Sequence, residues 1–248
     1  MKEYLKRILP RLKQFSEDLN RKEIFVDKSW VLINEDSDLQ RYIFKRDGKL
    51  IMSRNGDVQV GKWDYLPEAK SLLIDRVTDS ILLNQDFIDQ SVMLLRKDGD
   101  SNFFILASDS ILKDFDITSY FRQLYRTKNN VFTIELGTGD ELELLGSNRA
   151  VGGMQVSLDG DSSISDVYHN KNGKFLYYVE NGKITKVIER TTYKTKKGNL
   201  IIEQERDRDA KIGDFAYLED ALANGKFNIG LFKTVHTEKG IIVNVTSF

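Results

Sequence analysis

Short runs of alternating apolar and polar residues, separated by tight-turn dipeptides, dominate the chain. Between residues 30 and 107, strand-like runs end at Asp47-Gly48, Asn55-Gly56 and Asp98-Gly99. Asp-Gly and Asn-Gly favour two-residue hairpin turns because both central positions of such turns need positive φ. The pattern therefore predicts an antiparallel meander that closes or stacks into a small barrel or sandwich.

Two stretches depart from this alternation and predict helices. In residues 1–20, large apolar residues recur every three or four positions, with basic residues mainly off the resulting stripe. The stripe consists of Leu5, Ile8, Leu12, Phe15 and Leu19. A second helix is expected from about Ile117 to Arg126, where Asp116 is placed to cap its first turn.

The order of these segments predicts a mainly β protein in two halves. We expect an N-terminal helix plus an antiparallel β domain over residues 1–108 and a helical connector over residues 109–130. The strand pattern returns over residues 131–248, which predicts a second β domain. Each half is expected to form antiparallel meanders that build a small barrel or sandwich.

The second β half resembles itself. Residues 160–188 and 213–245 share Gly-Asp, then Asn-Gly-Lys-Phe, then Val, Gly and Ile in the same order. This succession of turn, strand, tight turn and return strand predicts a duplicated hairpin unit whose copies bury apolar surface together. It is also similar to short repeated β units of uncharacterised bacterial and phage proteins, a resemblance that implies no particular chemistry.

Residues 30–107 carry a recurring set of aromatic, glycine and aliphatic positions. They are Trp30, Tyr42-x-Phe44, Asp47-Gly48-Lys-Leu50, Gly56, Gly61-x-Trp63-x-Tyr65 and Leu72-x-Ile74. In these positions the segment resembles the lipocalin-like domains of bacterial proteins. The resemblance implies a small antiparallel barrel, and it implies little about function because that family is mostly without an assigned activity.

Trp63 and Tyr65 are the candidate ligand-binding residues. They alternate on one face of a predicted strand, from which both rings would stack on a ligand at the mouth of a barrel. The alternative is an ordinary core pair, and it is favoured because aromatic residues are common in strands.

Composition excludes several chemistries. The chain has 248 residues, no cysteine, two histidines and a formal net charge of −1. Disulfides, thiolate metal sites and cysteine nucleophiles are therefore excluded, and no global charge favours nucleic acid as a partner. No apolar run reaches the roughly 20 residues that span a bilayer. Because no signal-peptide pattern is visible, we expect a cytoplasmic location.

Candidate catalytic and metal-binding motifs are incomplete. Asp98-x-Asp100-x-Asn102 and Asp159-x-Asp161-x-Ser163 have the spacing of a calcium loop, but they lack its Gly at position six and its Glu at position twelve. Phosphate-binding loops and nucleophile elbows do not occur. We therefore predict no metal, no cofactor and no catalytic residue.

The sequence favours a non-catalytic protein–protein interaction module, such as an accessory, immunity-type or structural component of a bacterial assembly. The N-terminal stripe would bind another protein or pack on its own domain. Packing at home is favoured because Phe25 and Trp30 follow closely and leave little chain for the helix to reach far. The alternative function is a lipocalin-like binding protein for a small apolar molecule, and an enzyme based on carboxylates is the third.

Overall fold

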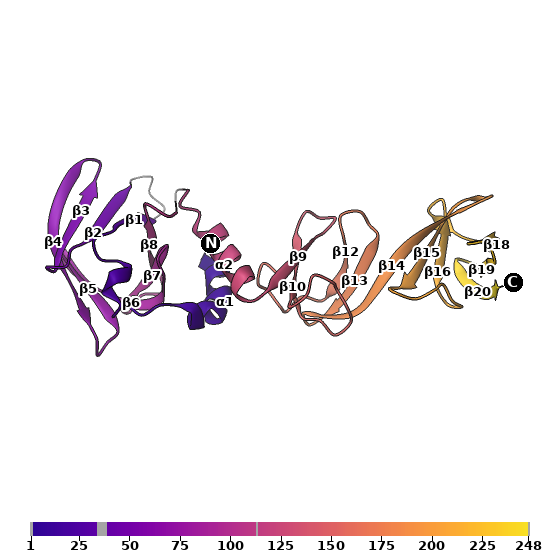
Figure 1. The fold of residues 1–248 in the computed structure, drawn as a ribbon, viewed down its shortest axis with the longest axis horizontal. Coiled ribbons are helices and arrows are strands. Elements are labelled where there is room, and N and C mark those ends of the chain that lie inside the picture. The colour runs from indigo at the N-terminus through magenta and orange to yellow at the C-terminus, as the bar shows by residue number, and fades with distance from the viewer. Residues whose placement is uncertain (1, 34–38, 113, 248) are drawn as a thin grey trace. The chain divides into compact units, whose positions relative to one another are not determined.

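The computed structural model describes residues 2–33, 39–112 and 114–247. The chain forms two compact units, residues 1–128 (unit 1) and 129–248 (unit 2), shown in Figure 1. Both are built mainly of antiparallel strands, with one α-helix at the N-terminus and one near the middle of the described residues. The expectation of a mainly β, antiparallel fold is thus confirmed. Within the described ranges, no helix has both the length and the apolar character to cross a membrane.

Unit 1 is a closed β-barrel. Its strands follow one another in chain order, each antiparallel to the next, and β8 pairs with β1 to complete the ring. In the described part of the chain these strands are β1 (Ser29–Ile33), β2 (Gln40–Phe44), β3 (Lys49–Arg54), β4 (Asp57–Leu66), β5 (Ser71–Arg76), β6 (Asp79–Ile88), β7 (Val92–Lys97) and β8 (Phe103–Ser108). A barrel of this size has an interior just wide enough for side chains to fill.

The barrel interior is filled by the side chains that point inward from the strands. Phe25, Phe44 and Trp63 meet edge to face, with ring centroids 5.4 to 5.7 Å apart. Leu50 and Leu72 from neighbouring parts of the wall are fully buried in the same cluster. Alternation of buried and exposed positions along the strands places Phe44, Leu50, Trp63 and Leu72 inside, as the two-residue repeat requires, whereas Phe25 enters from the segment before β1.

Residues 16–26 close one end of the barrel. This segment includes the short 3-10 helix η2 (Lys22–Ile24), and its Leu19 and Phe25 belong to the barrel core. The indole Nε1 of Trp30 donates to the carbonyl oxygen of Phe25 at 3.0 Å. The backbone nitrogen of Leu19 donates to Oε1 of Gln85 at 3.1 Å. The segment therefore acts as a plug that is fixed to β1 and β6.

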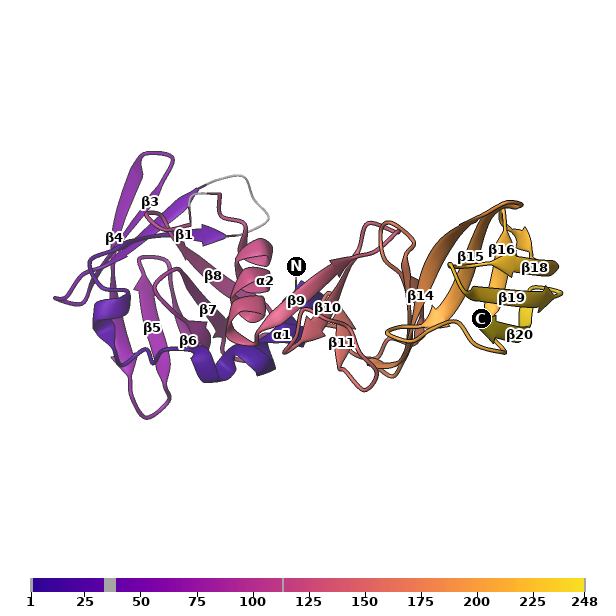
Figure 2. The same ribbon diagram turned by 45° about the vertical axis from the view of Figure 1, so that its right-hand side comes forward.

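Two helices pack side by side on the outside of the barrel, as Figure 2 shows. They are α1 (Lys2–Leu12), which continues into the 3-10 helix η1 (Lys13–Phe15), and α2 (Ile117–Lys128). Nη1 of Arg11 donates to the hydroxyl of Tyr125 at 2.7 Å, and the ring of Phe121 meets that of Phe87 in β6 with centroids 5.2 Å apart. We expected residues 109–130 to form a helical connector between the two halves. The helix in this segment, α2, belongs to unit 1.

Unit 2 contains two sheets and two successive cores. A three-stranded sheet, within the described residues, is formed by β9 (Val131–Glu135), β10 (Glu141–Leu145) and β11 (Val156–Leu158). The larger sheet contains β12 (Asp166–His169), β13 (Phe175–Glu180), β14 (Lys183–Thr195), β15 (Gly198–Glu205), β16 (Phe215–Leu218), β20 (Ile241–Ser247), β19 (Lys233–Glu238) and β18 (Gly225–Asn228) in that order, with β17 (Ala221–Leu222) on β16.

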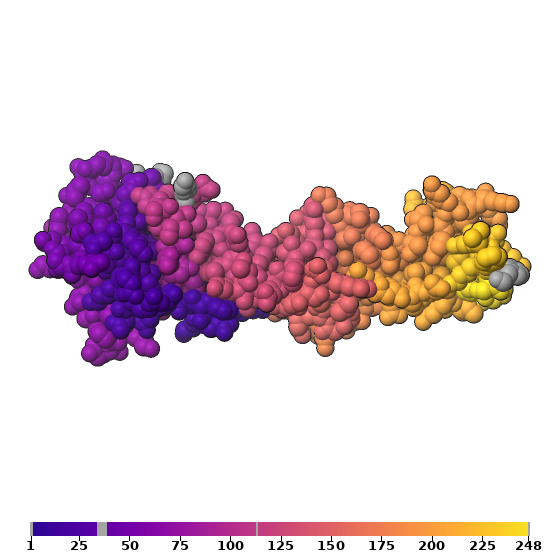
Figure 3. All heavy atoms as spheres, in the orientation of Figure 1, coloured from indigo at the N-terminus to yellow at the C-terminus, as the bar shows by residue number. Residues whose placement is uncertain are grey.

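The two cores of unit 2 are joined by the long β14 and β15. The first core packs the three-stranded sheet against β13 and the start of β14, around Leu144, Tyr177 and Ile184. The second lies farther along the large sheet, around Ile202 and Phe227. On the face that Figure 3 shows, atoms cover the gaps between the ribbons of each unit.

Candidate functional site

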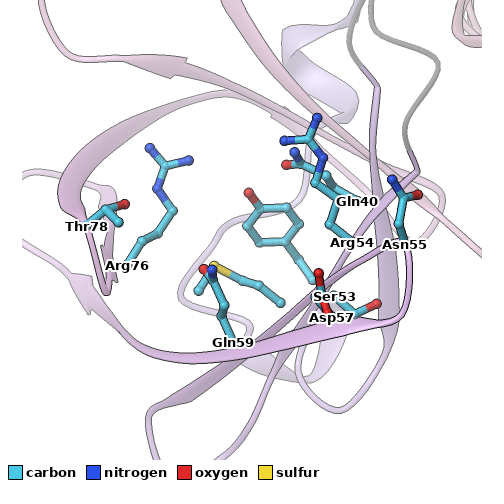
Figure 4. A pocket seen from close by; sticks show the side chains of 10 residues that line it. Gln40, Ser53, Arg54, Asn55, Asp57, Gln59, Arg76 and Thr78 are labelled. Carbon is cyan, nitrogen blue, oxygen red and sulfur yellow. The ribbon is translucent and has the colours of Figure 1, made fainter.

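A cavity of about 470 Å³ opens at the mouth of the barrel in unit 1. It lies at the strand ends away from the plug, because Gln40 begins β2 whereas Phe44 at the other end of β2 bridges to Val26. Figure 4 shows the lining side chains, which come from β2, β3, β4, the end of β5 and the turns that follow β3 and β5. This mouth cavity is lined by Gln40, Tyr42, Met52, Ser53, Arg54, Asn55, Asp57, Gln59, Arg76 and Thr78.

The two-residue repeat of the strands carries polar side chains to the mouth. Leu50, Met52 and Arg54 occupy alternate positions of β3, and they change from fully buried to exposed in that order. The inward-facing row therefore turns polar where the packed interior ends. The Asn55–Gly56 turn, with φ of 51° and 92°, then returns the chain into β4 and places Gln59 directly across from Met52, on the same face of the sheet.

Arg76 is fixed at the rim by a carboxylate. Its Nε donates to Oδ1 of Asp79 at 2.6 Å, and Nη2 donates to Oδ2 of the same group. The hydrogen bond to Asp79 raises the pKa of the guanidinium, and the nearby Tyr42 hydroxyl adds to this while burial opposes it. The same hydrogen bond lowers the pKa of Asp79. The ion pair holds Arg76 beside Tyr42 at the cavity.

Among the described residues, the mouth cavity is polar but balanced in charge. Arg54 and Arg76 bring positive charge, Asp57 brings negative charge to the lining, and Asp79 pairs with Arg76. Amide groups that both donate and accept hydrogen bonds come from Gln40, Asn55 and Gln59. The ring of Tyr42, held edge to face on Phe104 with centroids 6.0 Å apart, and the side chain of Met52 add apolar surface.

Comparisons with known proteins found no similar protein whose site could be compared with this one, so the site is interpreted from its geometry. No family model matches this chain, and no curated protein or solved structure was found to be similar to it. The lipocalin-like resemblance of residues 30–107 and the repeat within residues 160–245 therefore stay predictions.

The aromatic pair expected to bind a ligand lies elsewhere in the barrel. Trp63 and Tyr65 are 6% and 7% exposed and belong to the packed core near the plug, not to the mouth cavity. Nε1 of Trp63 donates to the carbonyl oxygen of Lys45 at 2.9 Å, and Lys22 lies 5.6 Å from its ring centroid. Trp63 also borders a hollow of about 310 Å³ on the outside. A ligand-binding role for either ring stays a prediction.

The N-terminal stripe is covered within its own fold. Leu5, Ile8, Leu12 and Leu19 are fully buried. Phe15 is half-buried, with Nζ of Lys128 5.5 Å from its ring centroid. Because α1 packs on α2 and β6, the stripe would have to leave these neighbours before it could bind a partner. Partner binding by the stripe stays a prediction.

In the aspartate-rich turns, the carboxylates accept hydrogen bonds from nearby backbone N–H groups. Oδ1 of Asp100 accepts from the backbone nitrogen of Asn102 at 3.0 Å, and Oδ1 of Asp161 accepts from that of Ser163 at 2.8 Å. Among the described residues, no group of three or more histidine, aspartate or glutamate side chains is placed to hold a metal ion.

The polar residues of the mouth were not predicted from the sequence, although a signal for them exists. Gln40-x-Tyr42-x-Phe44 and Leu50-x-Met52-x-Arg54 continue one inward-facing row from apolar into polar residues. A polar residue in the inward register at a strand end marks the opening of a barrel. Trp63 and Tyr65, which were predicted to bind a ligand, instead identify the packed interior.

Proposed function

We propose that the barrel of unit 1 binds a small, uncharged, hydroxyl-rich molecule in the mouth cavity. The cavity's volume of about 470 Å³ is within the range of small-molecule sites, which supports this proposal. Ligand hydroxyls donate and accept hydrogen bonds, as do the amides of Gln40 and Gln59. The carbon atoms of the ligand would rest on Tyr42 and Met52, and the balanced charges of the lining favour an uncharged molecule.

A purely apolar ligand, the alternative drawn from the sequence, has less support. The space below Tyr42 is occupied by packed side chains of the barrel core. An apolar molecule held above it would strip water from the polar groups of the mouth, including the amide of Gln59, without replacing the lost hydrogen bonds. Such burial of unpaired polar groups is costly.

Saturation-transfer NMR of the full chain tests the proposal, with glucose as the polar probe and laurate as the apolar one. We expect saturation transfer to glucose. Gln59→Leu should weaken glucose binding about fivefold, because one net hydrogen bond contributes about 1 kcal/mol. Gln123→Leu, on the exposed face of α2, is the matched control and should bind glucose like the wild type.

Two results would contradict the proposal. One is equal glucose binding by the wild type and Gln59→Leu. The other is transfer to laurate alone, and a matching change in Trp63 fluorescence would then favour the apolar-ligand alternative.

A protein–protein interaction module is the second candidate function, and an apolar patch on unit 2 supports it. Phe215, Leu222 and Ile241 are 48%, 54% and 40% exposed. Phe215 lies opposite Ile241, and Tyr217 opposite Leu222, so these four residues share one face of the sheet. We call them the sheet patch. Contiguous exposed apolar surface marks interaction sites, so we propose that a partner protein covers it in an accessory, immunity-type or structural role.

Quantitative pull-down from a native lysate tests this second candidate. We expect a partner at stoichiometric yield with the wild type and its loss with Phe215→Ser/Ile241→Thr, because apolar contact area would be removed. The control is Val58→Ser/Val60→Thr, which alters an exposed apolar pair of β4 in unit 1. Equal recovery by all three proteins would place the partner elsewhere.

A further inference from the structure

A second cavity, of about 440 Å³, is formed entirely by residues of unit 2. It lies where β9 and β13 meet the turns at residues 148–150 and 170–172. We call it the arginine pocket and define it by Thr133, Asn170, Asn172, Phe175, Tyr177 and Arg206. It shares no residue with the mouth cavity or the sheet patch.

Arg206 brings an uncompensated positive charge to this pocket. Its guanidinium carbon lies 4.8 Å from the ring centroid of Phe175, and Nη1 donates to the carbonyl oxygen of Ala150 at 3.0 Å. No carboxylate of the described residues forms an ion pair with it. Lys171, by contrast, pairs with Glu135 at 2.6 Å, which neutralises the other cation of the lining.

The asparagines of the pocket offer hydrogen-bond donors. Oδ1 of Asn170 accepts from the backbone nitrogen of Phe175 at 2.9 Å, and Oδ1 of Asn172 accepts from that of Lys174 at 3.0 Å. Because these oxygens are engaged by the backbone, the amide NH₂ groups are what the two side chains can offer to a ligand. Together with the guanidinium, they favour a ligand rich in acceptors.

An aromatic pair forms the floor beneath Arg206. Phe175 and Tyr177 are stacked, with centroids 6.5 Å apart and an interplanar angle of 25°. Burial raises the pKa of the Tyr177 hydroxyl and Arg206 opposes this, so that hydroxyl is neutral at neutral pH and adds no negative charge. Tyr177 is 3% exposed, whereas Phe175 is only partly buried and presents apolar surface to the pocket.

We infer that the arginine pocket binds a small organic monocarboxylate, with its carboxylate on Arg206 and its carbon skeleton on Phe175. A guanidinium matches a carboxylate because both are planar and form parallel, charge-assisted hydrogen bonds. One uncompensated positive charge balances one negative charge, which favours a monocarboxylate over a doubly charged phosphate. The aromatic floor favours a ligand with an apolar body.

Two-dimensional ¹H–¹⁵N NMR of the labelled full chain tests this inference, with benzoate as the probe. Benzyl alcohol serves as the uncharged comparison and inorganic phosphate as the second anion. We expect benzoate alone to cause saturable shifts of the Asn170 and Asn172 side-chain amides. Arg206→Gln should weaken benzoate binding at least tenfold. Arg190→Gln, which removes an arginine paired with Glu203 outside the pocket, should leave binding unchanged.

Thr133 supplies a second pair of variants that spares Arg206. Thr133 is an exposed residue of β9 at the rim, so Thr133→Asp adds a repelling charge with little effect on packing. We expect Thr133→Asp to weaken benzoate binding at least tenfold and Thr133→Asn to bind like the wild type. The inference is overturned by any of four results: no saturable shift, equal binding of benzyl alcohol, tighter binding of phosphate, or unchanged binding in Arg206→Gln or Thr133→Asp.

Discussion

Gly182 illustrates how much one turn residue can be constrained. Asn181 and Gly182 have φ of 48° and 67°, the geometry of the two-residue hairpin turn that Asn-Gly favours. A Cβ added at Gly182 would also collide with the carbonyl oxygen of Ser162. The dipeptide predicted the turn, but the close approach of a residue distant in sequence becomes visible only in the folded chain.

We predict that Gly182→Ala destabilises unit 2 by clearly more than Gly139→Ala. Gly139 also has positive φ, of 89°, but no atom lies within 4 Å of an added Cβ, so its alanine variant should lose only about 1–2 kcal/mol. Gly182→Ala adds the collision with the backbone at residue 162. Urea unfolding followed by far-ultraviolet dichroism measures both changes, and equal losses would show that the contact is relieved cheaply.

Turn dipeptides were informative about position but less so about type. At Asp47–Gly48 only the glycine has positive φ, of 81°, and its backbone nitrogen donates to the carbonyl oxygen of Lys45 at 3.1 Å. The turn is therefore longer than the two-residue turn that the dipeptide suggested. At Asn55–Gly56 both residues have positive φ, as expected. The extra residues at Asp47–Gly48 depend on strand twist and register, which a dipeptide does not encode.

At the scale of elements, the N-terminal helix was predicted too long. The apolar spacing extends to Leu19, but α1 ends at Leu12 and a 3-10 turn follows to Phe15. Leu19 is nevertheless fully buried, because the extended segment after the helix enters the barrel end as part of the plug. Buried residues at three- and four-residue spacing thus belong partly to a helix and partly to the extended segment after it. The spacing alone does not distinguish these two structures.

The suspected repeat contains one matching element and one that differs. The β13–β14 and β19–β20 hairpins both turn at a pair with positive φ, Asn181–Gly182 and Lys239–Gly240, and both have a register irregularity shortly before it. The shared Asn-Gly-Lys-Phe tokens differ in structure, because Asn172–Lys174 form a turn whereas Gly225–Asn228 form β18. Duplication therefore stays a prediction, since similar turn chemistry also produces such hairpins.

Barrel closure and the polar mouth were the least accessible features from sequence. Local alternation predicts strands and hairpins, but the pairing of Trp30 with Ser108 joins the first and last strands of the barrel. Nothing in a local pattern specifies so distant a partner. Arg54 and Arg76 come from different hairpins, and only the folded sheet brings both to the lining of one cavity.

At the scale of the whole molecule, the units can be followed separately. Both tryptophans, Trp30 and Trp63, lie in unit 1, so their fluorescence reports on the barrel. In unit 2, Asp214 accepts from Nη1 and Nη2 of Arg208 at 2.8 and 2.6 Å, and from the backbone nitrogen of Lys211 at 2.9 Å. This nearly buried carboxylate fixes the connection between β15 and β16.

We predict that Asp214→Asn destabilises unit 2 by about 2 kcal/mol, the scale of a lost hydrogen bond to a charged group, and leaves the tryptophan-reported transition unchanged. Calorimetry together with tryptophan fluorescence measures the two responses. Asp207→Asn, which alters an exposed ion pair with Arg149, is the control and should have little effect. A matching shift of the fluorescence transition would mean that the units unfold together.

The closed ring of unit 1 also determines how its backbone amides exchange with solvent. A ladder that joins β1 to β8 has no outer strand from which to fray, so its central amides should exchange with deuterium mainly when the whole ring opens. The large sheet of unit 2 ends at β12 and β18 and can open strand by strand from those ends. Two antiparallel sheets in one chain thus expose their backbone amides to solvent in opposite ways. The barrel of unit 1 opens all at once, and the large sheet of unit 2 opens gradually from its end strands.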